Sequence, residues 1–322
     1  MNKGLLWLLF SFLFLAGCGL LSSTDPQFSR EKYDRWYDKE EYQKALNHVN
    51  ERLESYPEDP LLWNEKGYIL INMEQYSEAL VPLEKAIEID AESDSAYNNK
   101  ALVYNETGEY EQAIVAAQKA IDLSEEEPEQ FINMGNALSF LERDEKALEY
   151  FNKALAIDAN APYAQYGKGV SLYFLGKYEE GIPYFENFLH SYPNDIDALW
   201  YLVYSHDTLG DYMETIPYLN QIIDHQNDNP INTMDYKGLM LTYAGKWDEA
   251  ATVYNGIIEQ YPREAIGYYG KGVLQIQKGQ TDNGLQSLEQ AVSLDNSLKD
   301  TAYNDPLLSS VYQHELFKSI VE

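Results

Sequence analysis

The side chains that could carry out catalysis or bind a metal ion are scattered along this 322-residue sequence. The five histidines lie far apart and show no metal-ligand spacing between them. They are His48, His190, His206, His225 and His314. The sequence has no HExxH, GxSxG or CxxC motif and no P-loop. We therefore expect no enzyme active site, no metal site and no cofactor.

Two short patterns resemble ligand-binding loops but are better explained by structure. The GKG triplets at 167–169 and 270–272 look like parts of phosphate loops, yet no Ser or Thr follows the lysine. The acidic run at 125–127 lacks the glycine and the ligand spacing of an EF-hand loop. We expect the glycines to serve helix packing and the acidic run to be a solvated turn.

The only cysteine, Cys18, lies directly after an apolar segment close to the first residue. Lys3 gives that segment a positive start, and the apolar run Leu5–Ala16 is too short for a comfortable bilayer span but typical of a signal peptide. Leu15-Ala16-Gly17-Cys18 matches the bacterial lipobox motif. The motif implies that residues 1–17 are cleaved off as a signal peptide and that a diacylglycerol thioether forms on Cys18.

Lipidation of Cys18 would hold the chain at a membrane surface. Two or three acyl chains, at about 0.8 kcal/mol per buried methylene, make an effectively permanent anchor. Gly19 rather than Asp follows the cysteine, which implies the outer membrane, facing the periplasm, in a two-membrane bacterium. In a one-membrane bacterium the chain would lie on the outer face of the cell membrane. Residues 18–25 would form the lipidated N-terminus and a short tether; the alternatives are an uncleaved signal anchor and a buried free thiol.

Beyond residue 25 the sequence repeats a pattern of about 34 residues. The clearest copy runs from Pro128 to Ala161, with Gly135 at its eighth place and Ala147 at its twentieth. Residues at the twentieth place recur at intervals of 34, with one interval of 35. They are Ala45, Ala79, Ala113, Ala147, Gly181, Thr215, Ala250 and Gly284. A fixed period in this range predicts stacked supersecondary structures rather than one globular core.

Each repeat predicts two antiparallel helices. Apolar residues recur at helical spacing in two runs, and a polar turn that often carries glycine separates them. The turn glycines are Gly108, Gly176, Gly210, Gly245 and Gly279. Small residues at the eighth and twentieth places would let the two backbones approach closely. Pro60 and Pro230 are among the prolines that open first helices, and Asp59 and Asn229 are the expected N-caps.

This pattern resembles the tetratricopeptide repeat. The second repeat matches the family at Trp63, Gly67, Ala79, Leu83 and Ala86. The resemblance covers residues 26–298, about eight repeats with a degenerate first one, and implies an all-α, right-handed superhelical solenoid. Val203 and Thr215 are bulky for their places. Residues 299–322 leave the register, and we expect them to form a C-terminal capping helix, since solenoids need such caps.

The resemblance also implies a ligand groove, because in this family the first helices line a concave face. In the second to fourth repeats the groove places hold mainly asparagine, with Tyr68 and Asn105 beside them. The asparagines are Asn64, Asn98, Asn99, Asn133 and Asn136. An asparagine amide offers one acceptor and two donors, so a row of them can pair with the backbone of an extended peptide.

The equivalent places of the fifth and sixth repeats are aromatic. They hold Tyr163, Tyr166, Tyr173, Phe174, Trp200, Tyr201 and Tyr204. Large rings anchor interfaces because they cover area with few rotors to freeze; the alternative is that rings at helical spacing belong to the core. The groove places hold no lysine or arginine, so we do not expect the clamp with which the chaperone-binding branch of the family holds a C-terminal carboxylate.

The net charge of -30 narrows the choice of partners. Such a surface repels phosphate backbones and anionic lipid head groups, which makes nucleic acid an unsuitable partner. We interpret the charge as a solvated exterior that keeps an exported solenoid soluble. The alternative is an acidic patch that recruits a basic partner.

These features together predict a lipid-anchored, extracytoplasmic adaptor that binds a protein or peptide in its groove. A role in the assembly or maintenance of the cell envelope follows from the resemblance to envelope lipoproteins with such repeats, and is analogy, since fold does not fix function. The alternative is a binder of glycans or small ligands that stacks sugar rings on the aromatic residues from Tyr163 to Tyr204. An enzyme without a recognisable motif is the third possibility.

Overall fold

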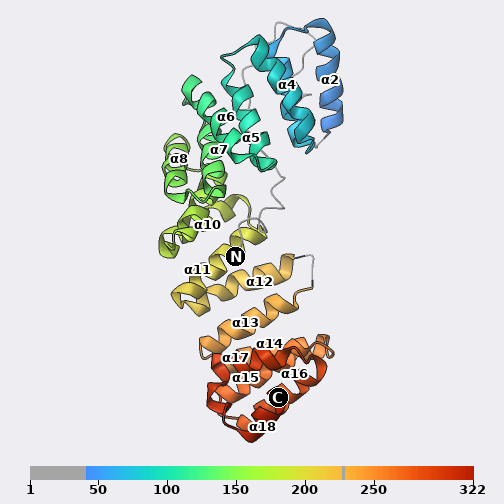
Figure 1. Cartoon of the computed structure of the whole chain (residues 1–322), viewed down its shortest axis with the longest axis vertical. Coiled ribbons are helices and arrows are strands. Elements are labelled where there is room, and N and C mark those ends of the chain that lie inside the picture. The colour runs from blue at the N-terminus through green and yellow to red at the C-terminus, as the bar shows by residue number, and fades with distance from the viewer. Residues whose placement is uncertain (1–40, 227–228) are drawn as a thin grey trace. The chain divides into compact units, whose positions relative to one another are not determined.

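The computed structural model describes residues 41–226 and 229–322, which form helices and turns without a β-strand (Figure 1). The expected signal peptide, Cys18 and the tether lie outside the described residues. The chain divides into two compact units, one ending at Phe188 and the other beginning at Leu189. We call them the N-terminal and C-terminal units and describe each by itself.

The N-terminal unit consists of helices that pack in consecutive pairs, as the repeat predicts. They are α2 (Tyr42–Ser55), α3 (Pro60–Asn72), α4 (Tyr76–Ile89), α5 (Asp94–Glu106), α6 (Tyr110–Leu123), α7 (Pro128–Phe140), α8 (Asp144–Ile157), α9 (Pro162–Phe174) and α10 (Tyr178–Ser191), whose last residues lie past the boundary.

The C-terminal unit continues the pairs and ends in shorter elements. It contains α11 (Ile196–Leu209), η2 (Tyr212–Glu214), α12 (Thr215–His225), α13 (Ile231–Tyr243), α14 (Trp247–Gln260), α15 (Ala265–Gln277), α16 (Thr281–Leu294), α17 (Leu298–Asn304), η3 (Pro306–Val311) and α18 (Glu315–Val321).

Helix starts follow the capping residues. Pro60 opens α3, and the Asp59 side chain accepts hydrogen bonds from the backbone N–H groups of Leu61 and Leu62, as expected of an N-cap. Helix α13 begins one residue later than predicted, at Ile231, with Pro230 as its N-cap. Asn229 nevertheless accepts a hydrogen bond from the Ile231 N–H at 3.2 Å.

The turns within the pairs confirm the role of glycine. All five predicted turn glycines have φ between 70° and 81°, a left-handed conformation that glycine adopts without steric cost. Glu74 and Glu142 adopt the same conformation in two of the other turns, with φ of 59° and 58°. Glycine is therefore favoured at this place but not required.

Small residues make room for large rings between helices. The Phe151 ring lies between α7 and α9, where a Cβ added to Gly135 would lie 2.7 Å from Phe151 Cε1 and one added to Gly167 would lie 2.3 Å from its Cζ. Tyr254 fills the equivalent space between Gly238 and Gly270 in the C-terminal unit. The GKG triplets therefore belong to helix packing, as the sequence indicates.

The sixth repeat departs from the others at its bulky twentieth residue. Thr215 is fully buried, and its hydroxyl donates a hydrogen bond to the Tyr212 carbonyl at 2.7 Å. The 3-10 turn η2 precedes α12, which has 11 residues where α14 and α16 have 14.

The end of the chain covers the last helix pair. Phe317 and Ile320 of α18 are buried in one cluster with Leu285 and Leu288 of α16. This closing helix agrees with the capping helix predicted from the sequence.

The first helices of successive repeats form one face of each unit. In the N-terminal unit α3, α5, α7 and α9 contact one another in turn, while α4, α6 and α8 each pack between the first helices on either side. In the C-terminal unit α13 contacts α15, and Trp200 of α11 lies against Tyr236 of α13. We call the surface formed by α3, α5, α7 and α9, and separately that formed by α11, α13 and α15, the first-helix face of its unit.

Two further properties concern the helices and side chains described. None of these helices is both long and apolar enough to cross a bilayer. Within the same residues, no group of three or more histidine, cysteine or acidic side chains is arranged to hold a metal ion.

Candidate ligand-binding faces

The asparagines of the N-terminal unit bond to one another from repeat to repeat. Asn99 donates its amide N–H to Asn64 Oδ1 at 2.9 Å, and Asn133 donates to Asn98 Oδ1 at 2.8 Å. In both pairs the sixth place of one repeat donates to the fifth place of the repeat before it. The predicted row of asparagines thus exists, and its members use part of their hydrogen-bonding capacity within the fold.

Burial limits which of these amides a ligand could reach. Asn133 is only 5% exposed, and its backbone carbonyl accepts a hydrogen bond from Asn105 Nδ2 at 3.0 Å. The expectation that Asn133 offers its amide to a peptide is therefore wrong, because the side chain is buried and hydrogen-bonded to Asn98 of the third repeat. Asn64, Asn98, Asn99, Asn136 and Tyr68 are half-buried and stay partly accessible.

The aromatic residues of the fifth repeat divide between core and surface. Tyr166 is 2% exposed and packs against Phe185 and Phe188 of α10, with ring centroids 5.9 Å and 4.9 Å away. Its predicted place on an open face is wrong, because the rings of α10 enclose it. Tyr163 and Tyr173 are half-buried, and the Tyr173 ring lies edge-on to Phe174.

In the C-terminal unit, Tyr201 of α11 is likewise part of the core. It is 2% exposed, which corrects the expectation that it lines the groove. Trp200 and Tyr204 of the same helix are half-buried and stacked on each other, with centroids 5.2 Å apart and an interplanar angle of 22°. These two predicted residues therefore do lie together on the first-helix face.

Tyr236 of α13 completes a cluster that the sequence reading missed. Its ring lies edge-on to both Trp200 and Tyr204, at 5.8 Å and 6.0 Å between centroids. Its hydroxyl donates a hydrogen bond to the Asp207 carboxylate of α11. Tyr236 occupies the sixth place of the seventh repeat, so extending the reading of groove places by one repeat would have found it. We call Trp200, Tyr204 and Tyr236 the aromatic cluster.

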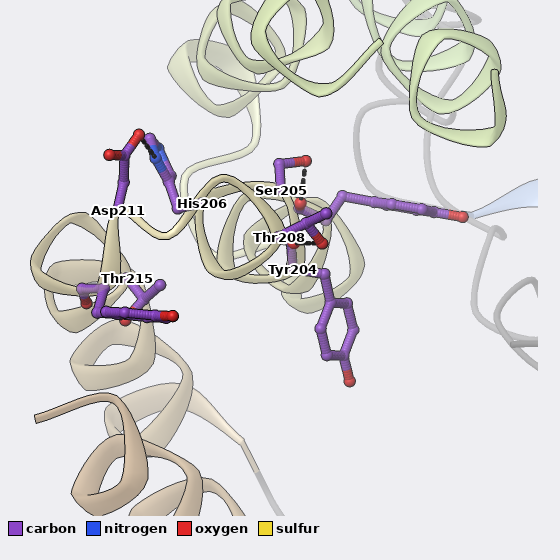
Figure 2. Close-up of polar contacts among 8 residues, drawn as sticks. Tyr204, Ser205, His206, Thr208, Asp211 and Thr215 are labelled. Atoms are coloured by element: carbon purple, nitrogen blue, oxygen red, sulfur yellow. Dashed lines mark hydrogen bonds and ion pairs between the residues drawn. The ribbon is translucent and has the colours of Figure 1, made fainter. Parts of the chain in front are cut away.

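The side of α11 that carries Tyr204 differs from the side that carries its histidine. Figure 2 shows the Tyr204 ring directed away from His206 and Asp211, whose Nδ1 and Oδ2 atoms lie 3.9 Å apart. His206 stacks on Tyr218 of the second helix α12, at 5.9 Å between ring centroids. Figure 2 also shows Thr208, whose hydroxyl donates to the Tyr204 carbonyl at 2.7 Å. His206 thus belongs to helix packing, and the aromatic cluster faces another way.

Acidic side chains lie among the aromatic residues of this face. Asp235 precedes Tyr236 on α13, is half-buried, and makes no hydrogen bond or ion pair with any described residue. Burial raises the pKa of its carboxyl group to about 7. Tyr269 of α15 donates its hydroxyl to Asp305 Oδ2 at 2.8 Å.

The carboxylates raise the pKa of two nearby tyrosine hydroxyl groups. Partial burial raises the pKa of Tyr243, and the charges of Asp305 and Asp207 raise it further. Burial, the hydrogen bond to Asp305 and the charges of Asp305 and Asp235 raise the pKa of Tyr269. The face thus combines aromatic rings with carboxylates whose charges act on the same tyrosine hydroxyl groups.

Comparison with known proteins gives consistent matches to one type of repeat. Tetratricopeptide repeat models match residues 61–93, 92–160, 166–230 and 238–298. A search of the curated proteins finds no match.

Solved structures match over most of their own length. The structure of pilF from Pseudomonas aeruginosa is 20% identical and aligns over 63% of this chain and 92% of its own, with a TM-score of 0.52. PilW, a type IV pilus biogenesis factor, is 17% identical over 63% of this chain and 94% of its own, also with a TM-score of 0.52. A tetratricopeptide repeat protein from Parabacteroides merdae is 17% identical over 91% of this chain and 97% of its own, with a TM-score of 0.48. At these identities the matches to pilF and PilW show a shared fold.

Proposed function

Since the chain belongs to the tetratricopeptide repeat family, we propose that it is a scaffold that binds a protein partner through its first-helix faces. The aromatic cluster of the C-terminal unit is the observation that carries this proposal. Partly exposed rings that stack on one another are preorganised, so a partner that covers them loses little side-chain entropy. Trp200 and Tyr204 are the residues on which we expect binding to depend most.

The N-terminal unit supplies a second, more polar face. Asn64, Asn98 and Asn99 are partly accessible, but Asn99 and Asn64 already bond to each other. A peptide backbone there would have to add to these bonds or replace them. We therefore assign the main contact to the aromatic cluster and a supporting one to the asparagines.

We place this scaffold at the membrane surface, held by a lipid on Cys18. The support is the lipobox at residues 15–18, in which the chain's only cysteine lies at the modified position. An extracytoplasmic location follows from such an anchor, and we propose a role in envelope assembly or maintenance by analogy with envelope lipoproteins that carry such repeats. PilW, which shares this fold, is a type IV pilus biogenesis factor, and that role is a property of PilW.

The lipid anchor has its own test. Wild type and Cys18→Ser are expressed in a bacterial host with an alkyne analogue of palmitate, and the membranes are fractionated. The proposal predicts labelling and membrane association of the wild type and loss of both in the variant. Equal membrane association of the unlabelled variant would point to an uncleaved signal anchor instead.

The scaffold role is tested by cross-linked capture from envelope membranes. The bait is the full-length chain as wild type, Trp200→Ala, and Tyr303→Ala, a matched control at an aromatic residue of α17 that is 66% exposed. All three must first show the same helical circular dichroism and melting temperature. We expect envelope proteins captured by the wild type and the control to be lost from Trp200→Ala.

Other outcomes distinguish the alternatives. Capture that is equal for all three baits would place binding outside the aromatic cluster. If no protein is captured, but glycan fragments bind in a manner insensitive to salt and lost in Trp200→Ala, the chain is a glycan binder. A sugar ring would then stack on the face of Trp200 or Tyr204 that is turned away from the other ring.

A further inference from the structure

We propose that the first-helix face of the C-terminal unit receives lysine or arginine side chains of the partner, so that the bound segment is basic. The aromatic cluster would hold the cation by its ring faces, and Asp207, Asp235 and Asp305 would pair with it. This inference rests on the proposed function and names the class of its partner.

The first support for a basic partner is the partly buried carboxyl group of Asp235. A carboxylate that is partly removed from water and lacks a hydrogen-bonding or ionic partner destabilises the fold unless a positive charge compensates it. Among the described residues Asp235 has no such partner. A lysine or arginine from another chain would supply the missing charge and hydrogen-bond donors at once.

Asp207 and Asp305 are held in place but keep free acceptor sites. Asp207 accepts one hydrogen bond from Tyr236, and Asp305 accepts from the Tyr269 hydroxyl and from the Leu307 N–H at 2.9 Å. An ionised carboxylate can accept about four hydrogen bonds. The tyrosine contacts therefore fix the orientation of both carboxylates and leave acceptor capacity for a guanidinium or ammonium group.

The three carboxylates belong to one region of the face. The charges of Asp207 and Asp305 both act on the Tyr243 hydroxyl, and those of Asp235 and Asp305 both act on the Tyr269 hydroxyl. Tyr243, at the end of α13, is exposed. Hydrogen bonds attach Asp207 to Tyr236 of α13 and Asp305 to Tyr269 of α15, so a partner segment lying across α11, α13 and α15 would meet these carboxylates together with the rings.

Within residues 41–226 and 229–322, lysine and arginine side chains pair with other groups than these three carboxylates. In the C-terminal unit Lys278 pairs with Asp248 at 3.2 Å, Lys237 donates to Asn220, and Lys318 pairs with Glu315 at 3.2 Å. No described lysine or arginine forms an ion pair with Asp207, Asp235 or Asp305.

The rings of the aromatic cluster, like the carboxylates, favour the binding of a positively charged group. A lysine or arginine head group over a tryptophan or tyrosine face gains a cation–π attraction, which is strongest for tryptophan. Trp200 and Tyr204 are partly exposed beside Tyr236 and its bonded Asp207. An acidic or phosphate-bearing partner would meet repulsion at the same place, consistent with a net charge of -30 for the whole chain.

The test is fluorescence anisotropy with the full-length chain in detergent and labelled peptides of repeated Gly-Ser-Lys. The same peptide with arginine, norleucine or glutamate in place of lysine completes the set. We expect the lysine and arginine peptides to bind at about 150 mM salt and the other two not to bind. Asp235→Asn should weaken binding at least about tenfold, the usual loss for a hydrogen bond between charged groups, and Asp207→Asn provides a second variant.

A control variant distinguishes binding at a specific site from attraction by the overall negative charge of the chain. Asp282→Asn on α16 removes the same charge from an exposed position and should change the affinity by less than about twofold. An equal loss in Asp282→Asn and Asp235→Asn would overturn the inference, since attraction would then be non-specific. If the basic peptides do not bind but capture still depends on Trp200, the scaffold role stands and the basic partner is wrong; if capture fails as well, both are wrong.

Discussion

The hydroxyl of Tyr236 donates a hydrogen bond to the carboxylate of Asp207, and this contact joins the first helices of two successive repeats, α11 and α13. The same Tyr236 ring lies edge-on to Trp200 and Tyr204. One side chain therefore connects the two helices and contacts both other rings of the aromatic cluster. It also holds a carboxylate beside the rings, which is the combination on which the proposed binding of a basic segment depends.

Replacing Tyr236 by phenylalanine separates the hydrogen bond from the ring. Tyr236→Phe should lower the free energy of unfolding by about 1–2 kcal/mol, because the Asp207 carboxylate loses a donor while the ring contacts remain. Urea denaturation measures this difference. Tyr236→Ala should cost more and should also abolish partner capture, whereas Tyr236→Phe, which keeps the ring but no longer orients the Asp207 carboxylate, should only weaken it. Complete loss of capture in both variants at unchanged helicity would show that the ring without its hydroxyl is not sufficient.

The distance from an added Cβ to its neighbours indicates which glycines tolerate a methyl group, and the Phe151 ring provides one case. Gly167→Ala places a Cβ 2.3 Å from Phe151 Cζ, which is closer than the two atoms can approach. The substitution should therefore destabilise the fold by about 1–3 kcal/mol. Gly256→Ala is the matched control, because no heavy atom lies within 4 Å of its added Cβ. It should stabilise α14 by up to about 1 kcal/mol. Thermal or urea unfolding measures both.

A compensating change tests the cause of the Gly167 effect. In a Phe151→Leu background the smaller side chain leaves room for the methyl group, so adding Gly167→Ala should cost less than it does in the wild type. A cost that is the same in both backgrounds would mean that the clash with Phe151 is not its origin.

The raised pKa of Asp235 predicts how stability depends on pH. Burial raises this pKa from 3.8 to about 7 in the folded chain, so the folded state binds the proton more tightly than the unfolded state. The stability that this group contributes is fully present below about pH 4, falls as the pH rises, and is lost above about pH 7. Asp197, whose pKa burial and the Asp195 charge raise to about 6, acts in the same direction.

Melting curves of wild type and Asp235→Asn at about pH 5.5 and pH 8 check this dependence. The wild type should melt at a higher temperature at the lower pH, and the variant should show a smaller difference. At the higher pH the variant should be the more stable of the two, because it lacks the uncompensated charge. A variant that is less stable than the wild type at the higher pH would mean that Asp235 has a favourable partner.

The asparagine row predicts two different outcomes for two neighbouring residues. Asn133→Ala removes a side chain that is 5% exposed and donates a 2.8 Å hydrogen bond to Asn98 Oδ1, and it should cost about 1–3 kcal/mol. Asn136 is half-buried and forms no hydrogen bond with another described residue, so Asn136→Ala should change stability by less than about 0.5 kcal/mol. Urea unfolding measures the stability of both variants. Equal losses in the free energy of unfolding would show that the hydrogen bond and burial of Asn133 make no difference to stability.

The sequence predicts the helix pairs well because their signals are local. The 34-residue period, the turn glycines and the small residue at the eighth place act within one repeat, and each reappears as expected at Gly108, Gly135 and Gly176. The capping helix at the end of the chain followed from the need to cover the last pair. The start of α13 was misplaced by one residue, because Asn229 bonds to Ile231 across a proline N-cap.

The site was predicted less completely, because exposure depends on the neighbouring repeat. Tyr166 and Trp200 occupy the same place in their repeats, yet Phe185 and Phe188 enclose Tyr166 while Trp200 stays partly exposed. No pattern within one repeat distinguishes the two. Asp305 was missed for a different reason, since it lies in the closing segment outside the register and reaches the face through Tyr269.

Photo-cross-linking from the two sides of the C-terminal unit tests the central claim most directly. A benzophenone amino acid is introduced at Thr208, an exposed residue of α11 next to the aromatic cluster, or at Asn255, an exposed residue of the second helix α14. We predict discrete protein adducts from Thr208 that disappear when Trp200→Ala is added, and none from Asn255. Adducts from Asn255 alone, or adducts from Thr208 that survive Trp200→Ala, would contradict binding through the first-helix face.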